Sequence, residues 1–336
     1  MIPAIFGFSG LTLTPDERAF FHDARPAGYI LFGRNVADRA QLRTLTDELR
    51  ALHGRDDLLI AIDQEGGRVA RMGPPVWPAY PPGEVFDRLF AVAPSSAIAA
   101  ARANAEAIGL DLAECGVTMN CLPLLDIRRP GAHDVIGDRA LGSDPLRVAA
   151  LGRATLDGLA EAGVVGVVKH IPGHGRAGAD SHKELPTVTA GADELEEDLR
   201  PFAALNRAPA AMTAHVCYTA WDADNPATQS RFVIQQIIRA RIGFDGLLIS
   251  DDLDMEALSG SVPERARRAI DAGCDLALNC WGKRDDMIGI AEILPTIGEV
   301  SLARLERAMA GSRIGEVAVE RHAALIQTRD RLLALA

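Results

Sequence analysis

The sequence predicts an α/β fold, a single (β/α)8 TIM-type barrel over residues 1–336 with a C-terminal helical extension. Two observations predict it: eight short apolar, β-branched runs recur along the chain, and amphipathic stretches lie between them. Near-continuous apolar runs are typical of parallel strands buried on both faces. Eight strands alternating with eight helices are the composition of this barrel. A doubly wound sheet with a helical appendage is the structural alternative, which the order of elements alone does not exclude.

The first helix has the clearest start signal, because Thr14 can cap it, Pro15 suits its first turn and Glu17 completes a capping box. No repeat or Gly/Ser-rich linker divides the chain, so we expect one domain. The expected strands lie at 4–9, 28–33, 58–63, 117–125, 164–170, 210–216, 247–251 and 275–280. Further helical stretches are expected around 37–52, 95–114, 145–162, 191–206, 230–241, 255–272 and 284–334.

Composition narrows the class of partner. The chain has 35 basic and 46 acidic residues, a net charge of −11, and no Lys/Arg-rich run. This argues against nucleic acid or an anionic membrane as the main partner and is compatible with an uncharged small molecule. The N-terminal segment lacks the basic region and cleavage site of a secretory signal, and no apolar run approaches the ~18 residues of a membrane span. We expect a cytoplasmic monomer.

Five cysteines are odd in number and form no CxxC pair. They suggest neither a zinc ribbon nor a complete disulfide framework, so reduced and mostly buried thiols are expected.

Three long loops follow predicted strands, at 64–84, 126–144 and 171–189, and barrel active sites are made of such loops. The first begins within the segment 63–68, DQEGGR, which sets two carboxylates and a guanidinium beside a glycine pair. A buried ion pair that closes a tight turn explains this segment equally well.

The densest polar cluster lies within 169–182, where three histidines, a lysine and an aspartate gather on a Gly/Pro-rich loop. The strand at 247–251 leads directly into Asp251, Asp252 and Asp254. Because adjacent side chains alternate in direction, only one of Asp251 and Asp252 should face a ligand, and another of these carboxylates can cap the following helix. Spacing does not choose between the two.

With these segments in view, the chain resembles glycoside hydrolase family 3, specifically the short bacterial β-N-acetylglucosaminidases of peptidoglycan recycling. The resemblance covers nearly the whole chain, and its motifs stand in the family's order. They are AIDQEGGRVARM (61–72), VIGDRALGSDP (135–145), KHIPGHGRAGADSH (169–182), MTAHV (212–216) and FDGLLISDDLDM (244–255).

The resemblance implies a role for each matching position. Asp251 becomes the nucleophile, and His182 with its partner Asp180 becomes the acid/base pair. Sugar-hydroxyl contacts are implied for Asp63, Arg71, Arg139, Lys169 and His170. Supporting positions near the site are implied for Glu65, Arg68, His174 and His215.

The implied reaction is hydrolysis with retention through a glycosyl-enzyme, which needs a carboxylate nucleophile and a group that first donates and then accepts a proton. A histidine with an aspartate partner can do this near neutral pH. The family's β-glucosidases usually place a glutamate acid/base in a further C-terminal domain, for which a chain ending at 336 leaves no room. N-acetylglucosaminide specificity is therefore expected, with no cofactor and no metal.

Two other functions are weighed. A metal-dependent barrel hydrolase would use His170, His174, His182 and Asp180 as ligands, but no HxH or HExxH pairing appears and Lys169 would repel a cation. A catalytically inactive sugar-binding protein is the non-enzymatic alternative, which fold alone cannot exclude. The three tryptophans follow predicted strands, where they could stack on a sugar, and no role is assigned to them: Trp77, Trp221 and Trp281.

Overall fold

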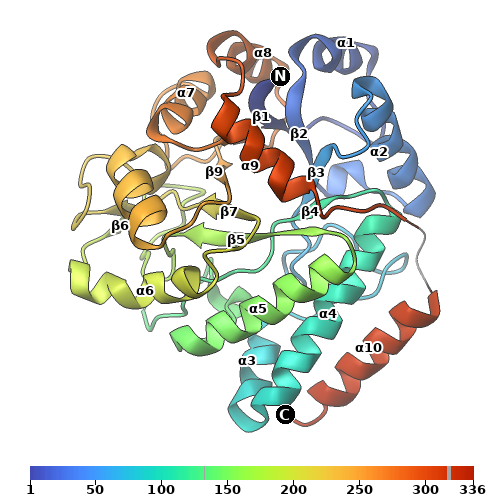
Figure 1. Ribbon diagram of the computed structural model, residues 1–336, viewed down its shortest axis with the longest axis vertical. Helices are drawn as coiled ribbons and strands as arrows, with labels where there is room; N and C mark the ends of the chain where they lie inside the picture. The colour runs from blue at the N-terminus through green and yellow to red at the C-terminus, as the bar shows by residue number, and fades with distance from the viewer. Residues whose placement is uncertain (132, 316–318) are drawn as a thin grey trace.

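The computed structural model describes residues 1–131, 133–315 and 319–336. Residues 132 and 316–318, which fall in the predicted loop 126–144 and the predicted helical stretch 284–334, lie outside the described residues. Eight parallel strands close into a barrel in the order β1-β10-β9-β7-β5-β4-β3-β2, surrounded by helices (Figure 1). The (β/α)8 prediction is confirmed, and the doubly wound alternative is wrong because the sheet has no open edge.

The barrel strands lie close to the predicted runs. They are β1 (Ile2–Phe6), β2 (Pro26–Leu31), β3 (Leu59–Ile62), β4 (Met119–Asn120), β5 (Val165–Ile171), β7 (Ala210–Thr213), β9 (Leu247–Asp252) and β10 (Leu276–Asn279). Two short strands, β6 (Thr187–Val188) and β8 (Cys217–Tyr218), pair with each other outside the barrel and were not predicted.

Both faces of the barrel strands are buried, as their apolar runs predicted. In β2, Ile30 packs in the cluster that fills the barrel, whereas its neighbours Tyr29 and Leu31 pack toward the helices. This alternation follows from the two-residue period of a strand. The polar residues that end the strands are thereby carried to one rim of a rigid core.

The helices match most of the predicted stretches. They are α1 (Pro15–Ala24), α2 (Arg39–His53), α3 (Gly83–Val92), α4 (Pro94–Glu114), α5 (Pro145–Glu161), α6 (Ala192–Ala204), α7 (Val262–Ala272), α8 (Arg284–Ile293), α9 (Glu299–Met309) and α10 (Val319–Leu333). Val233–Arg241 is π-helical, and single turns of 3-10 helix lie at Gly33–Asn35, Gly137–Arg139 and Ala227–Gln229. The capping box of α1 is present, since Glu17 N donates to Thr14 Oγ1 and Thr14 N donates to Glu17.

The helix α3 was not predicted, and the predicted boundaries differ most from the structure in three places. The strand predicted over 117–125 ends at Asn120, and Pro123, which lacks an amide hydrogen, follows soon after. The helix expected from 255 begins only at Val262, because 253–259 form turns at the barrel rim. The stretch 284–334 contains the separate helices α8, α9 and α10.

The helix α10 lies outside the barrel against α4, as Figure 1 shows at the C-terminus. Polar contacts hold it there: Arg329 Nη1 donates to Asn104 Oδ1, and His322 Nε2 lies 3.2 Å from Asp111 Oδ2. All five cysteines are buried and unpaired, as expected. Across the described ranges, no helix is long and apolar enough to cross a membrane.

Candidate active site

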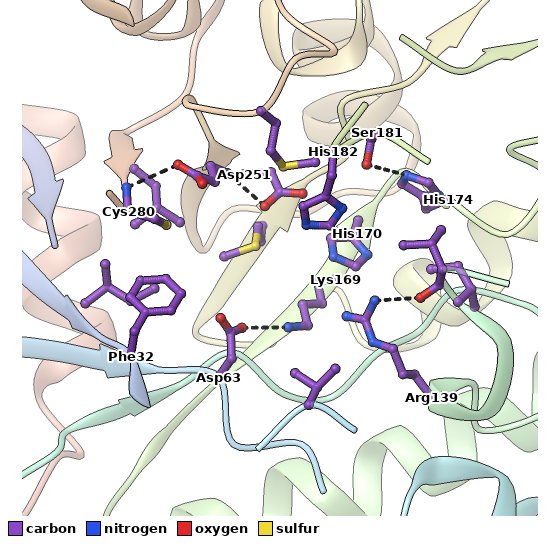
Figure 2. Close-up of a pocket in the computed structure, with 18 of the residues that line it drawn as sticks. Phe32, Asp63, Arg139, Lys169, His170, His174, Ser181, His182, Asp251 and Cys280 are labelled. Carbon is purple, nitrogen blue, oxygen red and sulfur yellow. Dashed lines mark hydrogen bonds and ion pairs between the residues drawn. The ribbon is translucent and has the colours of Figure 1, made fainter. Parts of the chain in front are cut away.

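A pocket opens at the carboxyl ends of the barrel strands (Figure 2). Loops and strand ends that are far apart in sequence supply its walls, since parallel strands bring their carboxyl ends to one rim. The predicted residues that line it are Asp63, Arg71, Arg139, Lys169, His170, His174, His182, Asp251 and Asp252. The pocket also contains Phe32, Ser181 and Met255, which sequence reasoning did not single out, and Cys280, one of the five cysteines expected as reduced thiols.

One wall of the pocket carries a buried charge network. Lys169 Nζ lies 3.0 Å from Asp63 Oδ1 and 2.7 Å from Glu65 Oε1. Arg139 donates twice to Glu65, at 2.9 and 2.8 Å, and Arg71 donates to Asp63 Oδ2 at 3.3 Å. Burial raises the pKa of Glu65, but Lys169 and Arg139 outweigh it and hold this pKa far below its usual range. The network keeps both carboxylates ionised beside the pocket.

The glycine pair after β3 has the conformation that the turn requires. Gly66 has φ +107°, and a Cβ there would collide with the carbonyl oxygen of Pro81. The ion-pair interpretation of the segment 63–68 is therefore correct, since both carboxylates pair with Lys169, and its role in a site stays a prediction.

Asp251 and Asp252 stand at the end of β9 in different surroundings. Burial raises the pKa of Asp251, but His170, His215 and the amide of Asp252, whose hydrogen bond to Asp251 Oδ1 is 2.8 Å, lower it below its usual value. The pKa of Asp252 rises to about 8 because of burial and the neighbouring Asp254 carboxylate. Asp251 is therefore the ionised carboxylate near neutral pH, a distinction that sequence spacing could not make.

Asp252 does not cap a helix. Its Oδ1 accepts hydrogen bonds from the amides of Asp254 and Cys280, each at 3.1 Å. The capping interpretation of these carboxylates is wrong for Asp252, whose side chain instead ties the end of β9 to the end of β10.

His182 and Asp180 form a pair on the loop after β5. His182 Nδ1 lies 2.8 Å from Asp180 Oδ1, and the same oxygen accepts the amide hydrogen of His182 at 3.0 Å. The pKa of Asp180 is lowered because these two hydrogen bonds outweigh its slight burial. The imidazole is 64% exposed, and it projects into the pocket together with the Asp251 carboxylate (Figure 2). Asp180 itself reaches the pocket only through His182.

A second aspartate–histidine pair joins the fully buried Asp126, which was not predicted, to His170 at the pocket wall. Asp126 accepts hydrogen bonds from His170 Nδ1 at 2.7 Å, from the amide of His170 at 3.1 Å and from the amide of His174 at 2.6 Å. The imidazole of His170 is thus fixed, with Nδ1 directed away from the pocket. The signal available in the sequence is a carboxylate directly after the apolar run CLPLL, at the end of the strand predicted over 117–125.

Comparison with known proteins identifies the family. The glycosyl hydrolase family 3 N-terminal domain matches residues 10–314. The chain belongs to glycosyl hydrolase family 3. A β-hexosaminidase of Alkalilimnicola ehrlichii is 41% identical over 313 residues, which cover 91% of this chain and 88% of that protein. A β-hexosaminidase of Aromatoleum aromaticum is 39% identical over 338 residues, covering 98% and 93%.

A solved structure extends the likeness to three dimensions. NagZ from Neisseria gonorrhoeae in complex with N-trifluoroacetyl-D-glucosamine superposes with a TM-score of 0.87 and 33% identity, covering 99% of this chain and 98% of that one. The family 3 resemblance predicted from the motifs is confirmed. The chain is a glycoside hydrolase of the bacterial β-N-acetylhexosaminidase type.

Two residues implied as supporting the site, Arg68 and His215, contact segments that line the pocket. Arg68 Nε donates to Asp138 Oδ1 at 2.8 Å and holds the loop that carries Arg139. His215 Nε2 lies 2.9 Å from the carbonyl oxygen of Asp252. Of the tryptophans, Trp77 is buried, Trp221 packs against Tyr218, and Trp281 is 62% exposed.

The alternative of a metal-dependent hydrolase requires a cluster of metal ligands. In the part of the chain that the structure describes, no group of three or more His, Cys, Asp or Glu side chains is placed to hold a metal ion. Of the four suggested ligands, His170 is engaged by Asp126 and His182 by Asp180.

Proposed function

We propose that this protein is an exo-acting retaining β-N-acetylglucosaminidase that works by double displacement. The observation that carries the proposal is one pocket lined by an ionised carboxylate, Asp251, and an exposed imidazole with an aspartate partner, His182 with Asp180. A retaining glycosidase needs a nucleophile and an acid/base group of this kind at one sugar.

In the first step, an oxygen of Asp251 attacks the anomeric carbon while protonated His182 gives its proton to the departing glycosidic oxygen. The sugar becomes covalently bound to Asp251, and the aglycone leaves as an alcohol. In the second step, neutral His182 takes a proton from water, whose oxygen attacks the same carbon and releases Asp251. Asp180 stabilises the imidazolium form and orients the ring.

The buried charge network supplies the sugar-binding groups in this proposal. Lys169, Arg71 and Arg139 are hydrogen-bond donors, and Asp63 is an acceptor at the same wall. Hydroxyl groups donate and accept at once, so a wall that presents both kinds of partner suits them. His170, held by Asp126, presents its second ring nitrogen toward the same sugar.

We further propose a terminal, non-reducing N-acetylglucosamine on cell-wall fragments of the GlcNAc-1,6-anhydro-muramyl peptide type as the substrate. Release of N-acetylglucosamine from such fragments, compared with release from chitooligosaccharides, tests this choice. Reaction with and without added phosphate tests whether water is the second-step acceptor, because phosphorolysis would yield the sugar 1-phosphate.

The central experiment compares release from an aryl β-N-acetylglucosaminide and the matching β-glucoside by wild type, Asp251→Ala and His182→Ala. We expect preference for the acetamido sugar and near-complete loss in Asp251→Ala. Asp245→Ala is the matched control, since Asp245 lies just before the opposite end of β9 and is exposed. Equal rates on both sugars, or an active Asp251→Ala, would refute the proposal.

The same experiment addresses the alternatives. A sugar-binding protein without catalysis would give no turnover in the wild type. A metal-dependent hydrolase would lose activity on prolonged chelation, whereas the proposed mechanism predicts no loss.

We also propose a cytoplasmic monomer in which residues 1–336 fold as one domain. Five buried, unpaired cysteines suit a reducing compartment. Cell fractionation tests the location, sedimentation tests the oligomeric state, and limited proteolysis that leaves the barrel and α10 together tests the domain assignment.

A further inference from the structure

The segment 178–185, which carries the acid/base pair, is docked onto the barrel through one buried residue. Ser181 is 3% exposed, whereas its neighbours in this segment are exposed or only partly buried. Its carbonyl oxygen accepts a hydrogen bond from the amide of Ala257 at 3.3 Å. Its hydroxyl group lies 3.2 Å from His174 Nε2 (Figure 2). Ser181 stands between Asp180 and His182, so its position sets theirs.

His174 is a fixed support for this contact. It is buried, and its amide donates to Asp126 Oδ1 at 2.6 Å. The stem around it is held as well, since the hydroxyl of Tyr218 donates to the carbonyl oxygen of Gly173 at 2.7 Å and Arg176 pairs with Asp198. The base of the loop is therefore rigid up to Arg176, and the acid/base segment beyond it is anchored by Ser181.

The imidazole of His174 packs edge-on against the ring of His170, with 5.7 Å between the ring centroids. Burial and the nearby His170 lower its pKa to about 4, so the ring is neutral at neutral pH. Among the described residues, its Nδ1 is buried without a hydrogen-bond partner, and Nε2 is engaged only with Ser181. A buried nitrogen without a hydrogen-bond partner destabilises the folded state by about 1–3 kcal/mol. A contribution to packing therefore does not explain why position 174 is a histidine.

We propose that His174 and Ser181 are positioning residues for the acid/base pair: their hydrogen bond fixes the Asp180–His182 turn over the pocket. The inference rests on the proposed role of His182. Proton transfer requires His182 Nε2 within about 2.6–3.2 Å of the glycosidic oxygen, and a displacement of ~1 Å can reduce the rate about 100-fold. Asp126 couples this geometry to the sugar-binding His170, because one carboxylate holds both histidines.

The test uses the leaving-group dependence of kcat/KM, measured with aryl β-N-acetylglucosaminides whose phenols range from acidic to weakly acidic. An acidic phenol departs with little protonation, whereas a weakly acidic phenol needs the acid. We expect Ser181→Ala and His174→Leu to lose about tenfold more activity on the weakly acidic phenols than on the acidic ones. His174→Gln should recover most of this loss, because its amide nitrogen can reach the position of Nε2.

Controls separate positioning from general damage. Ser312→Ala removes a similar hydrogen bond, to the carbonyl oxygen of Met309, far from the pocket and should leave the leaving-group dependence unchanged. The double variant Ser181→Ala/His174→Leu should be no worse than either single variant, because both remove one contact. Additive losses, or equal losses on all phenols, would overturn the proposal.

His182→Ala, measured in parallel, distinguishes the two proposals. A steep leaving-group dependence in His182→Ala with a wild-type dependence in Ser181→Ala refutes the positioning role and keeps the acid/base role. A flat dependence in His182→Ala refutes the acid/base role itself. Should His174→Leu fail to fold, Ser181→Ala and His174→Gln still decide the question, since both are small changes.

Discussion

Replacing Glu65 by glutamine tests the buried charge network beside the pocket. Glu65 lies 2.7 Å from Lys169 and accepts two hydrogen bonds from Arg139, and all three side chains are at most 10% exposed. Glu65→Gln keeps the shape of the side chain but removes its charge, so Arg139 loses its carboxylate partner. Removing one partner of a buried ion pair is destabilising by about 3–5 kcal/mol.

This free energy converts into a melting temperature. An unfolding entropy of about 2.1 cal/mol/K per residue gives ~0.7 kcal/mol/K for a chain of this length. Tm should therefore fall by about 4–7 °C in Glu65→Gln, as measured by calorimetry at neutral pH. KM for the aryl β-N-acetylglucosaminide should rise, because Lys169 and Arg139 lose the group that holds them at the pocket wall.

A matched variant supplies the control. Glu114 pairs with Arg39, but these side chains are 32% and 35% exposed. Exposed pairs contribute about 0–1 kcal/mol, so Glu114→Gln should lower Tm by only ~1 °C. The double variant Glu65→Gln/Arg139→Met should be less destabilised than the sum of its single variants. A Tm for Glu65→Gln within about 1 °C of the wild-type Tm would contradict this reasoning, because the buried network would then contribute less to the free energy of unfolding than its burial predicts.

Two predictions concern pH. Because the pKa of Asp252 is raised to about 8 in the folded protein, its contribution to stability is complete below about pH 4 and is lost as pH rises toward 8. The Tm of Asp252→Asn should therefore fall less than the Tm of the wild type between about pH 5 and pH 9. Parallel curves of Tm against pH for the two proteins would contradict the raised pKa of Asp252. Burial lowers the pKa of His53 to about 4, so its contribution is present above about pH 6.5 and is lost as pH falls toward 4. The Tm of His53→Gln should therefore fall less than the wild-type Tm as pH decreases below about 6.5. An equal fall in both proteins would mean that the pKa of His53 is the same in the folded and unfolded chain.

The barrel was predictable because its signal is repeated eight times along the chain, and an error at one strand does not alter the count. The error at 117–125 came from treating CLPLL as strand, although these residues leave the sheet after Asn120. Asp126 directly follows that predicted run, but the sequence does not show that its carboxylate contacts His170 and His174, which lie 44 and 48 residues further along the chain. Ser181 gave no signal of its own, because its burial depends on His174 and Ala257.

The preference for Asp251 over Asp252 shows why position in sequence is insufficient for chemistry. Both carboxylates line the pocket, and both follow the same strand. Burial opposes the charge on both, but His170 and His215 favour it on Asp251, whereas the neighbouring Asp254 opposes it further on Asp252. Two neighbouring carboxylates on one strand thereby become an anion and a neutral acid near pH 7, and only the anion can serve as a nucleophile.

The two aspartate–histidine pairs use one hydrogen-bond pattern for different tasks, and burial separates them. Asp126 holds His170 by Nδ1, and this ring is only 9% exposed, so it is held in one orientation at the pocket wall. Asp180 holds His182 by the same nitrogen, but this ring is 64% exposed. A group that donates a proton in one step and receives one from water in the next must reach both the substrate and the solvent. The exposed Asp180–His182 pair meets that requirement. Because an exposed pair has little packing to hold it, we propose that the buried Ser181 between the two residues fixes their position.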